Sequence, residues 1–222
     1  RLGALHGLPT AVKDLADLTG FPTTYGYRPF ANQIAKEDSL FVRRERNAGA
    51  LFIGKTNTPE FGLGSHTFNS LFGSTKNPFD LTRTPGGSSG GAAVSLACGM
   101  LPIADGSDMG GSLRNPAAFC NVVGFRPSIG RIPSLNDMGW LSRLSTSGPM
   151  ARTVADVSLL FSVQAGPDDS DPLSLNESGT VFDDVFSNDP TGLRVAFSPD
   201  LGGLPIEKEV VDVIKTAIPV FE

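Results

Sequence analysis

The sequence predicts an α/β fold, in which helices and strands alternate along the chain. Short apolar runs suited to buried strands recur between segments with helical spacing, and glycine- or proline-rich turns separate them. A hydrophobic content of 40% and a charged content of 18% are typical of a globular protein. The 222 residues are enough for one large domain or two small ones.

The first elements follow from apolar runs and their terminators. Residues 7–14 (GLPTAVKD) form a short apolar run that ends in a charged pair, which predicts a strand. Residues 39–47 are expected to form a helix that ends before Gly49, and residues 50–53 a buried strand ended by glycine. Residues 62–88 are rich in Gly, Ser, Thr, Asn and Pro, which predicts one long functional loop.

The rest of the chain continues the alternation. The middle is expected to hold a small-residue helix over 89–100, a strand over 101–104, a glycine-rich turn over 105–112 and a strand over 122–126. A further helix opens at Thr153, whose hydroxyl lies three residues before the Asp156 carboxylate, a helix-start signal. The last expected elements are an acidic, turn-rich excursion over 166–192, a strand over 193–197 and a helix over 206–222.

Charge and cysteine usage exclude several classes. The net charge is -5, and the longest basic cluster, 43–46, is interrupted by Glu45, so direct nucleic-acid binding is not expected. The most apolar run, 92–104, is shorter than the roughly 20 residues that cross a bilayer. Cys98 and Cys120 are far apart without a C-x-x-C pattern, so we expect reduced thiols in a cytoplasmic protein, with no metal and no cofactor.

Residues 49–56 (GALFIGKT) match the phosphate-loop pattern at Gly49, Gly54, Lys55 and Thr56. A phosphate loop follows a strand and starts a helix at its lysine, whereas here a helix comes first. The interior Ala-Leu-Phe-Ile suits a buried strand. A nucleotide-binding module is the alternative of another class, and an ATP titration with and without Mg²⁺ is expected to show no binding.

Two serines and one lysine offer a different chemistry. The stretch PGGSSGG matches the esterase pattern G-x-S-x-G at Ser88 or Ser89, but that triad needs a downstream histidine and both histidines, His6 and His66, lie upstream. Lys13 ends an apolar strand, and a buried lysine loses proton affinity because desolvation disfavours the ammonium. Neutral Lys13 could therefore serve as a general base for a serine.

A second loop adds the remaining part of an acyl-transfer site. Gly110 and Gly111 let the backbone turn its N–H groups inward, next to Ser112 at the start of a helical segment. Such a nest of N–H groups stabilises a developing oxyanion. The sequence therefore contains a base candidate, two serine loops and an oxyanion nest.

Three ordered stretches resemble the amidase signature family: GLPTAVKD around Lys13, the long block at 85–133 (PGGSSGG through SIGRIP) and SGPMARTVAD at 147–156. The similarity runs from about residue 4 to 163. The resemblance implies a mixed β-sheet core flanked by helices on both faces, in three layers. It also implies that residues 1–222 are a single domain truncated at both ends, since the chain opens on Arg1 and stops at Glu222 inside a helical pattern.

The resemblance also assigns roles. The family's serine–cis-serine–lysine triad maps onto Ser112 as nucleophile, Ser88 as the serine after a cis peptide bond, and Lys13 as base. Its oxyanion donors map onto the backbone N–H groups of Met109, Gly110, Gly111 and Ser112. The implied activity is hydrolysis of a carboxylic amide C–N bond through an acyl-enzyme. The family alternative is the catalytic A subunit of a glutamyl- or aspartyl-tRNA amidotransferase.

Supporting residues are expected around this triad. Ser89 is expected to be a helix-start hydroxyl, and Asp108 to pair with Arg114 or with backbone amides. Met109 stands where the family often has Thr, and Asp105 stands where a small or apolar residue is usual. The expected partner is a small-molecule amide, and the expected assembly is a homodimer. Candidate pocket-wall residues are Thr58, Phe61, Phe68, Asn69 and Trp140, while the excursion over 166–192 is expected to be a solvated loop or a lid.

Overall fold

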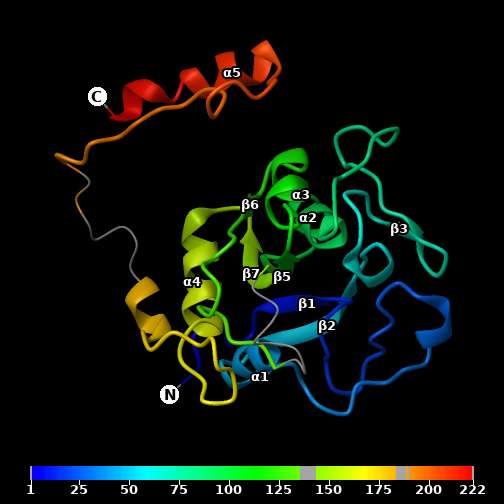
Figure 1. The fold of residues 1–222 in the computed structure, drawn as a ribbon. Helices are drawn as coiled ribbons and strands as arrows, with labels where there is room; N and C mark the ends of the chain where they lie inside the picture. The colour runs from blue at the N-terminus through cyan, green and yellow to red at the C-terminus, as the bar shows by residue number, and fades with distance from the viewer. Residues whose placement is uncertain (1, 136–143, 184–188, 190, 222) are drawn as a thin grey trace. The chain divides into compact units, whose positions relative to one another are not determined.

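The computed structural model of the protein describes residues 2–135, 144–183, 189 and 191–221. The chain divides into two compact units, residues 1–185 and residues 186–222. The strands, all in the first unit, are β1 (Pro9–Lys13), β2 (Leu51–Thr56), β3 (Phe68–Asn69), β4 (Gly73–Ser74), β5 (Ile103–Asp108), β6 (Val123–Gly124) and β7 (Thr146–Ala151) (Figure 1).

The helices of the first unit are α1 (Leu40–Asn47), α2 (Gly90–Ala97), α3 (Arg114–Phe119) and α4 (Val154–Gln164), with 3-10 turns η1 (Arg28–Phe30), η2 (Glu60–Gly62) and η3 (Gly179–Phe182). The second unit contains α5 (Lys208–Lys215) and the 3-10 turn η4 (Ile218–Phe221). No helix within the described ranges is long and apolar enough to cross a membrane.

Parallel and antiparallel pairings meet in the core. β1 pairs with β2 in parallel, while β5, β7 and β6 form an antiparallel sheet in that spatial order. β1 lies beside β5, where the Thr10 hydroxyl donates to the Ile103 carbonyl at 3.3 Å. In Figure 1, α2 and α3 lie above these strands and α1 lies below them. This arrangement confirms the predicted α/β fold, with parallel and antiparallel strand pairs side by side and helices on both sides.

Small residues bring α2 close to the strands. Ala92, Ala93 and Leu96 are fully buried in a cluster with Leu113 and Met150. A Cβ on a residue replacing Gly91 would collide with the Asn57 backbone just beyond β2, so glycine is required by this approach. The predicted small-residue helix is therefore confirmed, and its packing fixes the loop that precedes it.

Other predicted elements are also confirmed. The helix expected at 39–47 is α1, and its end is followed by Gly49 with φ +91°. α4 begins as expected, since the Thr153 hydroxyl accepts the Asp156 backbone N–H at 3.1 Å. Gly54, expected to end a strand, instead lies inside β2.

The structure corrects several boundaries. β5 continues through Asp108 into the region expected to be a glycine-rich turn, and β7 was not predicted at all. These two strands support each other, because their residues pair from Ile103 opposite Ala151 to Asp108 opposite Thr146. The strand expected at 193–197 is not formed, and the loop over 62–88 contains the short β3–β4 hairpin.

The segment that matches the phosphate-loop pattern is part of the sheet. Gly54, Lys55 and Thr56 form the end of β2. The Lys55 ammonium donates to the Ala16 carbonyl at 2.8 Å and lies 3.3 Å from the Asp14 carboxylate. The lysine is therefore committed to the protein, and no loop is present there to surround a phosphate.

A side chain from α1 holds the end of α4. The Arg44 guanidinium donates to the carbonyls of Gln164, Gly166 and Pro167 at 2.8, 3.0 and 2.8 Å. These carbonyls lie at and beyond the C-terminus of α4, where helical acceptors are unpaired. The chain returns to the same helix at η3, where the Ser158 hydroxyl donates to the Phe182 carbonyl.

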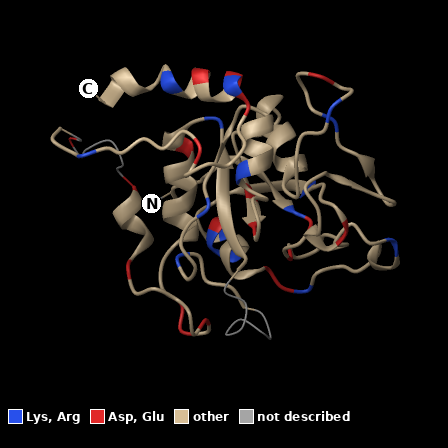
Figure 2. Ribbon diagram, turned by 45° about the horizontal axis from the view of Figure 1, so that its top comes forward, with Lys and Arg blue, Asp and Glu red and all other residues tan. Residues whose placement is uncertain are grey.

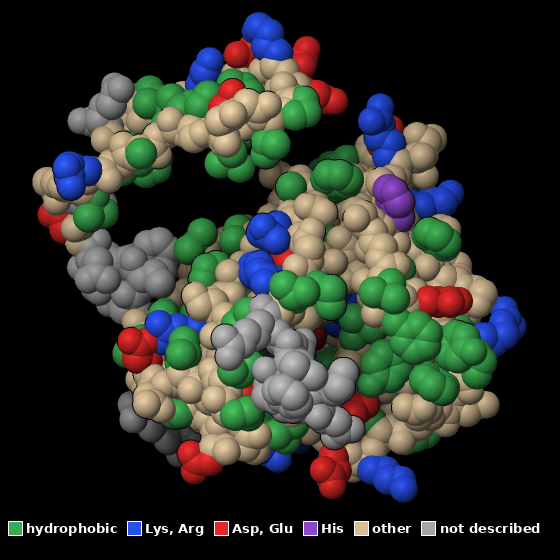
Figure 3. Space-filling model, viewed as in Figure 1, with side chains coloured by type: hydrophobic (Ala, Val, Ile, Leu, Met, Phe, Trp, Pro, Cys, Tyr) green, Lys and Arg blue, Asp and Glu red, His purple; other side chains and the backbone are tan. Residues whose placement is uncertain are grey.

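The described surface carries both charge signs. Figure 2 shows Lys and Arg interspersed with Asp and Glu. Hydrophobic side chains gather on the right of the space-filling view, where the segments over 20–38 and 57–84 lie (Figure 3). Exposed members of these two segments include Ile34, Phe61, Leu63, Phe68 and Phe72.

We expect Leu160→Ala to lower the free energy of unfolding by about 2–5 kcal/mol, because Leu160 is fully buried between α4 and the strands. Chemical denaturation followed by circular dichroism measures the change. Val154→Ala is the matched control, since Val154 is 54% exposed on the same helix and should change stability by less than about 0.5 kcal/mol. Equal losses for both variants would contradict the packing described above.

Candidate active site

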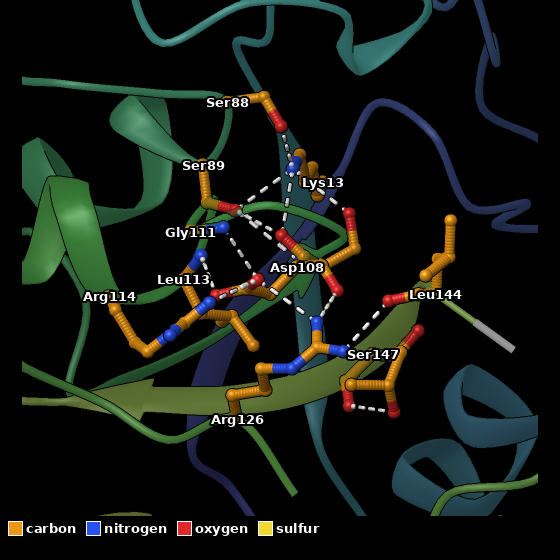
Figure 4. A network of polar contacts seen from close by, with 12 residues as sticks. Lys13, Ser88, Ser89, Asp108, Gly111, Leu113, Arg114, Arg126, Leu144 and Ser147 are labelled. Atoms are coloured by element: carbon orange, nitrogen blue, oxygen red, sulfur yellow. Dashed lines mark hydrogen bonds and ion pairs between the residues drawn. The ribbon is translucent and has the colours of Figure 1, made fainter. Parts of the chain in front are cut away.

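Lys13 is the centre of a buried polar cluster. It ends β1 and is only 1% exposed. Its ammonium nitrogen Nζ donates to Ser88 Oγ at 2.7 Å, to Ser89 Oγ at 2.9 Å and to Ser107 Oγ at 3.0 Å (Figure 4). Three hydroxyls, from the loop before α2 and from β5, therefore converge on one amine, and no carboxylate of the described residues lies within hydrogen-bonding distance of it.

The burial of this amine changes its acidity. Desolvation lowers the pKa of Lys13 to about 7, although the negative charges of Asp105 and Asp108 partly oppose the change. Near neutral pH, a substantial fraction of Lys13 is therefore uncharged. An uncharged amine in contact with a serine hydroxyl can accept its proton.

The loop before α2 presents two serines to Lys13. The peptide bond between Gly87 and Ser88 is cis, as the family resemblance implies. The expectation for Ser89 was wrong: it precedes α2, but its side chain makes no capping hydrogen bond. Its hydroxyl instead contacts the Lys13 ammonium and accepts the Ser107 backbone N–H at 3.3 Å, because the buried cation needs acceptors.

Ser112 lies beside this loop. The Ser89 backbone N–H donates to the Ser112 carbonyl at 3.2 Å, which joins the two serine loops. Ser112 is half-buried, and its hydroxyl has no hydrogen-bond partner among the residues that the structure describes. The structure therefore brings the three residues of the expected triad into one region, with the Ser112 hydroxyl uncommitted.

Asp108 shapes the turn that leads to Ser112. Its carboxylate accepts the backbone N–H groups of Gly111 at 2.8 Å and Leu113 at 3.1 Å, and two hydrogen bonds from the Arg114 guanidinium at 3.0 and 3.1 Å. Arg126 donates to it as well, at 3.0 Å. The expected pairing of Asp108 with Arg114 and with backbone amides is therefore confirmed.

These bonds also decide the charge of Asp108 and the donors that remain. Burial alone would raise the pKa of Asp108, but the hydrogen bonds from Arg114, Gly111 and Leu113 outweigh it and hold the pKa well below its usual range. The Gly111 N–H is occupied by this carboxylate. The N–H groups of Met109, Gly110 and Ser112 donate to no acceptor within the described part of the chain.

Two further carboxyls are buried behind Lys13. Asp105, in β5, is 2% exposed and its Oδ1 accepts the Lys13 backbone N–H at 3.0 Å. Burial raises the pKa of Asp105 to about 6. Asp105 was conspicuous in the sequence as a departure from the family pattern, but the pattern gave no indication of its partner.

Glu45, in α1, is 1% exposed and accepts a hydrogen bond from Gln164 Nε2 at 2.7 Å. Its other oxygen and the Gln164 Oε1 atom are both buried without a hydrogen-bond partner in the part of the chain that the structure describes. A protonated carboxyl group satisfies such an arrangement, since its O–H can donate to an amide oxygen. Burial and the nearby charge of Asp105 raise the pKa of Glu45 to about 8, in agreement with the protonated form.

The turn that contains Phe61, one of the expected wall residues, lies close to Ser88. A Cβ at the next residue, Gly62, would stand 3.6 Å from Ser88 Oγ and 2.6 Å from the Leu15 side chain. Thr58 and Asn69 are instead buried, and Asn69 Nδ2 donates to the Thr58 carbonyl at 2.8 Å. Phe68 is exposed, and Trp140 lies outside the described residues.

Phe61 belongs to an aromatic cluster. Its ring stacks on Tyr25 with centroids 6.0 Å apart and contacts Tyr27 at 5.2 Å and Phe30 at 6.3 Å. The Phe61 N–H also donates to the Tyr25 carbonyl at 2.7 Å. The cluster therefore ties the turn over Ser88 to the segment that follows β1.

A cavity lies close to the polar cluster around Lys13. It has a volume of about 430 Å³ and is lined by Leu15 and Tyr25, by residues at the start of α1, and by Ser147. Ser147 pairs with Ser107 in the β5–β7 ladder, and Ser107 contacts Lys13. The cavity is therefore next to the polar cluster. In the described ranges, no group of three His, Cys, Asp or Glu residues is arranged to hold a metal ion.

The sequence is similar to those of known amidases and amidotransferase subunits. A family model described as Amidase matches residues 1–222. An acylamidase from Rhodococcus erythropolis is 46% identical over 222 residues, which are all of this chain and 46% of that protein. The A subunit of the glutamyl-tRNA(Gln) amidotransferase from Carboxydothermus hydrogenoformans is 41% identical over 220 residues, 99% of this chain and 45% of that protein.

The fold is also similar to those of solved structures of related enzymes. A bacterial aryl acylamidase of the amidase signature enzymes superposes with a TM-score of 0.92 at 36% identity, over 100% of this chain and 46% of that one. A 6-aminohexanoate cyclic dimer hydrolase gives 0.88 at 33% identity, over 97% of this chain and 46% of that one. The chain thus spans about half the length of the relatives that it matches.

We expect the buried Glu45 carboxyl to make the folded state less stable as pH rises. Its pKa is higher in the folded than in the unfolded chain, so its stabilising contribution is complete below about pH 4.5 and is lost as pH rises through about 8. The free energy of unfolding of Glu45→Gln, measured relative to that of wild type, should therefore rise by more than about 1 kcal/mol between pH 5 and pH 8.5. This is the free energy that corresponds to roughly one pKa unit.

Urea unfolding of both proteins at several pH values measures this difference. Glu37→Gln serves as the control, because Glu37 is exposed in the segment before α1. A difference between Glu45→Gln and wild type that stays constant with pH would contradict a protonated Glu45.

Proposed function

The chain belongs to the amidase signature family, and on this premise we propose that the whole protein is an amidase that hydrolyses a carboxylic amide through an acyl-enzyme. The observation that carries the proposal is the buried Lys13 amine in contact with the hydroxyl of Ser88. We propose Ser112 as nucleophile, Ser88 as proton shuttle and Lys13 as base, within a single amidase domain whose catalytic core spans about residues 4–163.

Proton transfer begins at the lysine. The uncharged Nζ of Lys13 takes the hydroxyl proton of Ser88, which in turn takes that of Ser112. The Ser112 oxygen then forms a bond to the amide carbonyl carbon, and the carbonyl oxygen becomes an oxyanion. The 2.7 Å contact between Lys13 and Ser88 supports the first transfer, and the backbone bond between Ser89 and Ser112 holds the two serine loops together. The second transfer requires the Ser112 hydroxyl to turn toward Ser88, since the two hydroxyls are not hydrogen-bonded in this conformation.

The turn over 109–112 is proposed to stabilise the oxyanion. Since the Gly111 N–H donates to Asp108, the donors in this conformation are the N–H groups of Met109, Gly110 and Ser112, while Gly111 remains the fourth member of the expected set. The Lys13 ammonium then returns its proton through Ser88 to the leaving nitrogen, and the C–N bond breaks. Water repeats the sequence on the ester, releasing the acid and restoring Ser112.

The aromatic cluster indicates the kind of substrate. Phe61 is 45% exposed in the turn whose next residue, Gly62, lies close to Ser88, and its contacts with Tyr25 and Tyr27 extend this aromatic surface. A small-molecule amide with an aryl or other apolar group would bury that surface. The similarity to an aryl acylamidase with a TM-score of 0.92 supports this choice.

The A subunit of a tRNA-dependent amidotransferase is the second candidate, favoured by 41% identity to one such protein. The structural similarity is lower, with a TM-score of 0.76 to the Thermotoga maritima protein over 80% of this chain. Glutaminase activity that appears only with a partner protein would favour this alternative. We further propose a cytoplasmic enzyme, consistent with free thiols at Cys98 and Cys120, and a homodimer, which light scattering can test.

We expect Ser112→Ala in the full-length protein to lower kcat for hydrolysis of 4-nitroacetanilide by at least about 10³-fold, because no other group would form the ester. Mass spectrometry after rapid quenching should place the acetyl group on Ser112 in wild type. Ser170→Ala, an exposed serine far along the chain from the triad, is the control. Full turnover by Ser112→Ala, or label on another residue, would refute the assignment.

The pH dependence of kcat/KM should report the Lys13 base. Because the amine must be uncharged to accept a proton, the rate should rise with pH through an apparent pKa of about 7. Lys13→Arg should remove activity at every pH, since a guanidinium cannot lose its proton in this range. A profile that is flat from pH 5 to 9 would argue against a lysine base.

A further inference from the structure

We propose that Asp105 is a positioning residue for the lysine base: its carboxylate fixes the backbone of Lys13 and supplies the buried negative charge that sets how readily the ammonium releases its proton. This inference rests on the proposed amidase function. It concerns a buried residue that contacts the lysine base and that the triad mechanism does not use.

The first observation is the bond that Asp105 makes. β1 and β5 lie side by side without pairing in one hydrogen-bonded ladder. The Lys13 backbone N–H therefore needs another acceptor at the end of β1, and Asp105 Oδ1 provides it at 3.0 Å. A side chain of β5 thus takes the place of a strand carbonyl and holds the residue that carries the amine.

The second observation is that Asp105 shares a face of β5 with Ser107. Side chains two residues apart in a strand point to the same side. Ser107 Oγ accepts a hydrogen bond from Lys13 Nζ at 3.0 Å, while Asp105 holds the Lys13 backbone. One strand therefore contacts both ends of the lysine, the main chain through a carboxylate and the amine through a hydroxyl.

The third observation concerns the other charges around Lys13. The ionisable groups near Lys13 are Asp105 and Asp108 from β5, Asp14 after β1, Lys55 from β2 and Glu45 from α1, while α2, which packs against β1, carries none. Asp14 and Lys55 pair with each other, and Asp108 is neutralised by two arginines. Glu45 faces Gln164 in the arrangement of a protonated acid. Asp105 is thus the nearby buried carboxylate without a cationic side chain in hydrogen-bond contact among the described residues.

Electrostatics then gives the direction of its effect. A buried anion stabilises a neighbouring ammonium, so the Asp105 charge opposes the loss of proton affinity that burial causes in Lys13. Asp105 itself has a pKa of about 6, below that of Lys13, so it is ionised over most of the range in which the lysine titrates. Removing the Asp105 charge while keeping an oxygen that accepts the Lys13 N–H should lower the pKa of Lys13. The amine is then a weaker base, but it is uncharged at lower pH.

Asp105→Asn in the full-length enzyme tests this directly, because the amide oxygen can still accept the Lys13 N–H. The acid limb of the kcat/KM profile for 4-nitroacetanilide should move to lower pH by about one unit, with KM changed less than about twofold. The pKa of Lys13, followed by NMR of ¹³C-labelled lysine, should move in the same direction. Glu45→Gln is the matched control and should leave both readouts unchanged, since it replaces a carboxyl that is already uncharged.

A merely structural role for Asp105 would lower kcat without moving the limb, and an unchanged or raised Lys13 pKa in Asp105→Asn would overturn the proposal. The NMR titration needs no turnover, so it still decides the matter if the wild-type enzyme cleaves no amide and the proposed function fails. If Asp105→Asn does not fold, a titration of the wild-type protein tests the proposal. The chemical shift of Lys13 must then show a second inflection at the pH where the ¹³C-labelled Asp105 carboxyl titrates. A Lys13 titration curve without this inflection would refute the coupling between the two groups.

Discussion

Burial of the Lys13 amine is the constraint on which the rest of the site depends. A lysine that is 1% exposed has lost its hydration, and the protein must supply its polar contacts. Three serine hydroxyls do so, from the loop before α2 and from β5. The same contacts fix the relative positions of β1, β5 and the serine loops. The acyl-transfer geometry proposed here is therefore the consequence of satisfying one buried amine with hydroxyls.

Polar groups continue behind the lysine into the core. Asp105 accepts the Lys13 backbone N–H, and Glu45 and Gln164 follow at the contact between α1 and α4. Each of these side chains is at most 2% exposed, so each needs a partner or a proton. This row of buried polar groups therefore extends from the site to the contact between α1 and α4, two helices that carry no residue of the proposed triad.

Local signals indicated the residues of the proposed triad and predicted most helices, whereas the elements that were missed depend on tertiary pairing. Lys13, Ser88 and Ser112 stand in short motifs, so the sequence identifies them without the fold. β7 was missed because TSGPMA contains Gly and Pro and becomes a strand only through its pairing with β5. The segment 193–197 has strand-like composition but no strand partner among the described residues. The role of Ser89 was predicted wrongly because its hydroxyl accepts a hydrogen bond from Lys13, 76 positions away in the sequence, and not from a backbone N–H of the adjacent helix.

The contact between Arg44 and the end of α4 has a consequence for how this fold can vary. Arg44 holds the chain where it leaves α4, and the Ser158 hydroxyl holds it again at η3. The segment between these two anchors is also held in its middle, since the Leu175 N–H donates to the Gly130 carbonyl at 3.0 Å and the Asp171 carboxylate accepts the Ser134 N–H at 2.8 Å. An insertion or deletion between Asp168 and Ser178 would therefore have to keep these two contacts as well as both ends. Changes of length over evolution are thus restricted here to the short stretches between the fixed residues.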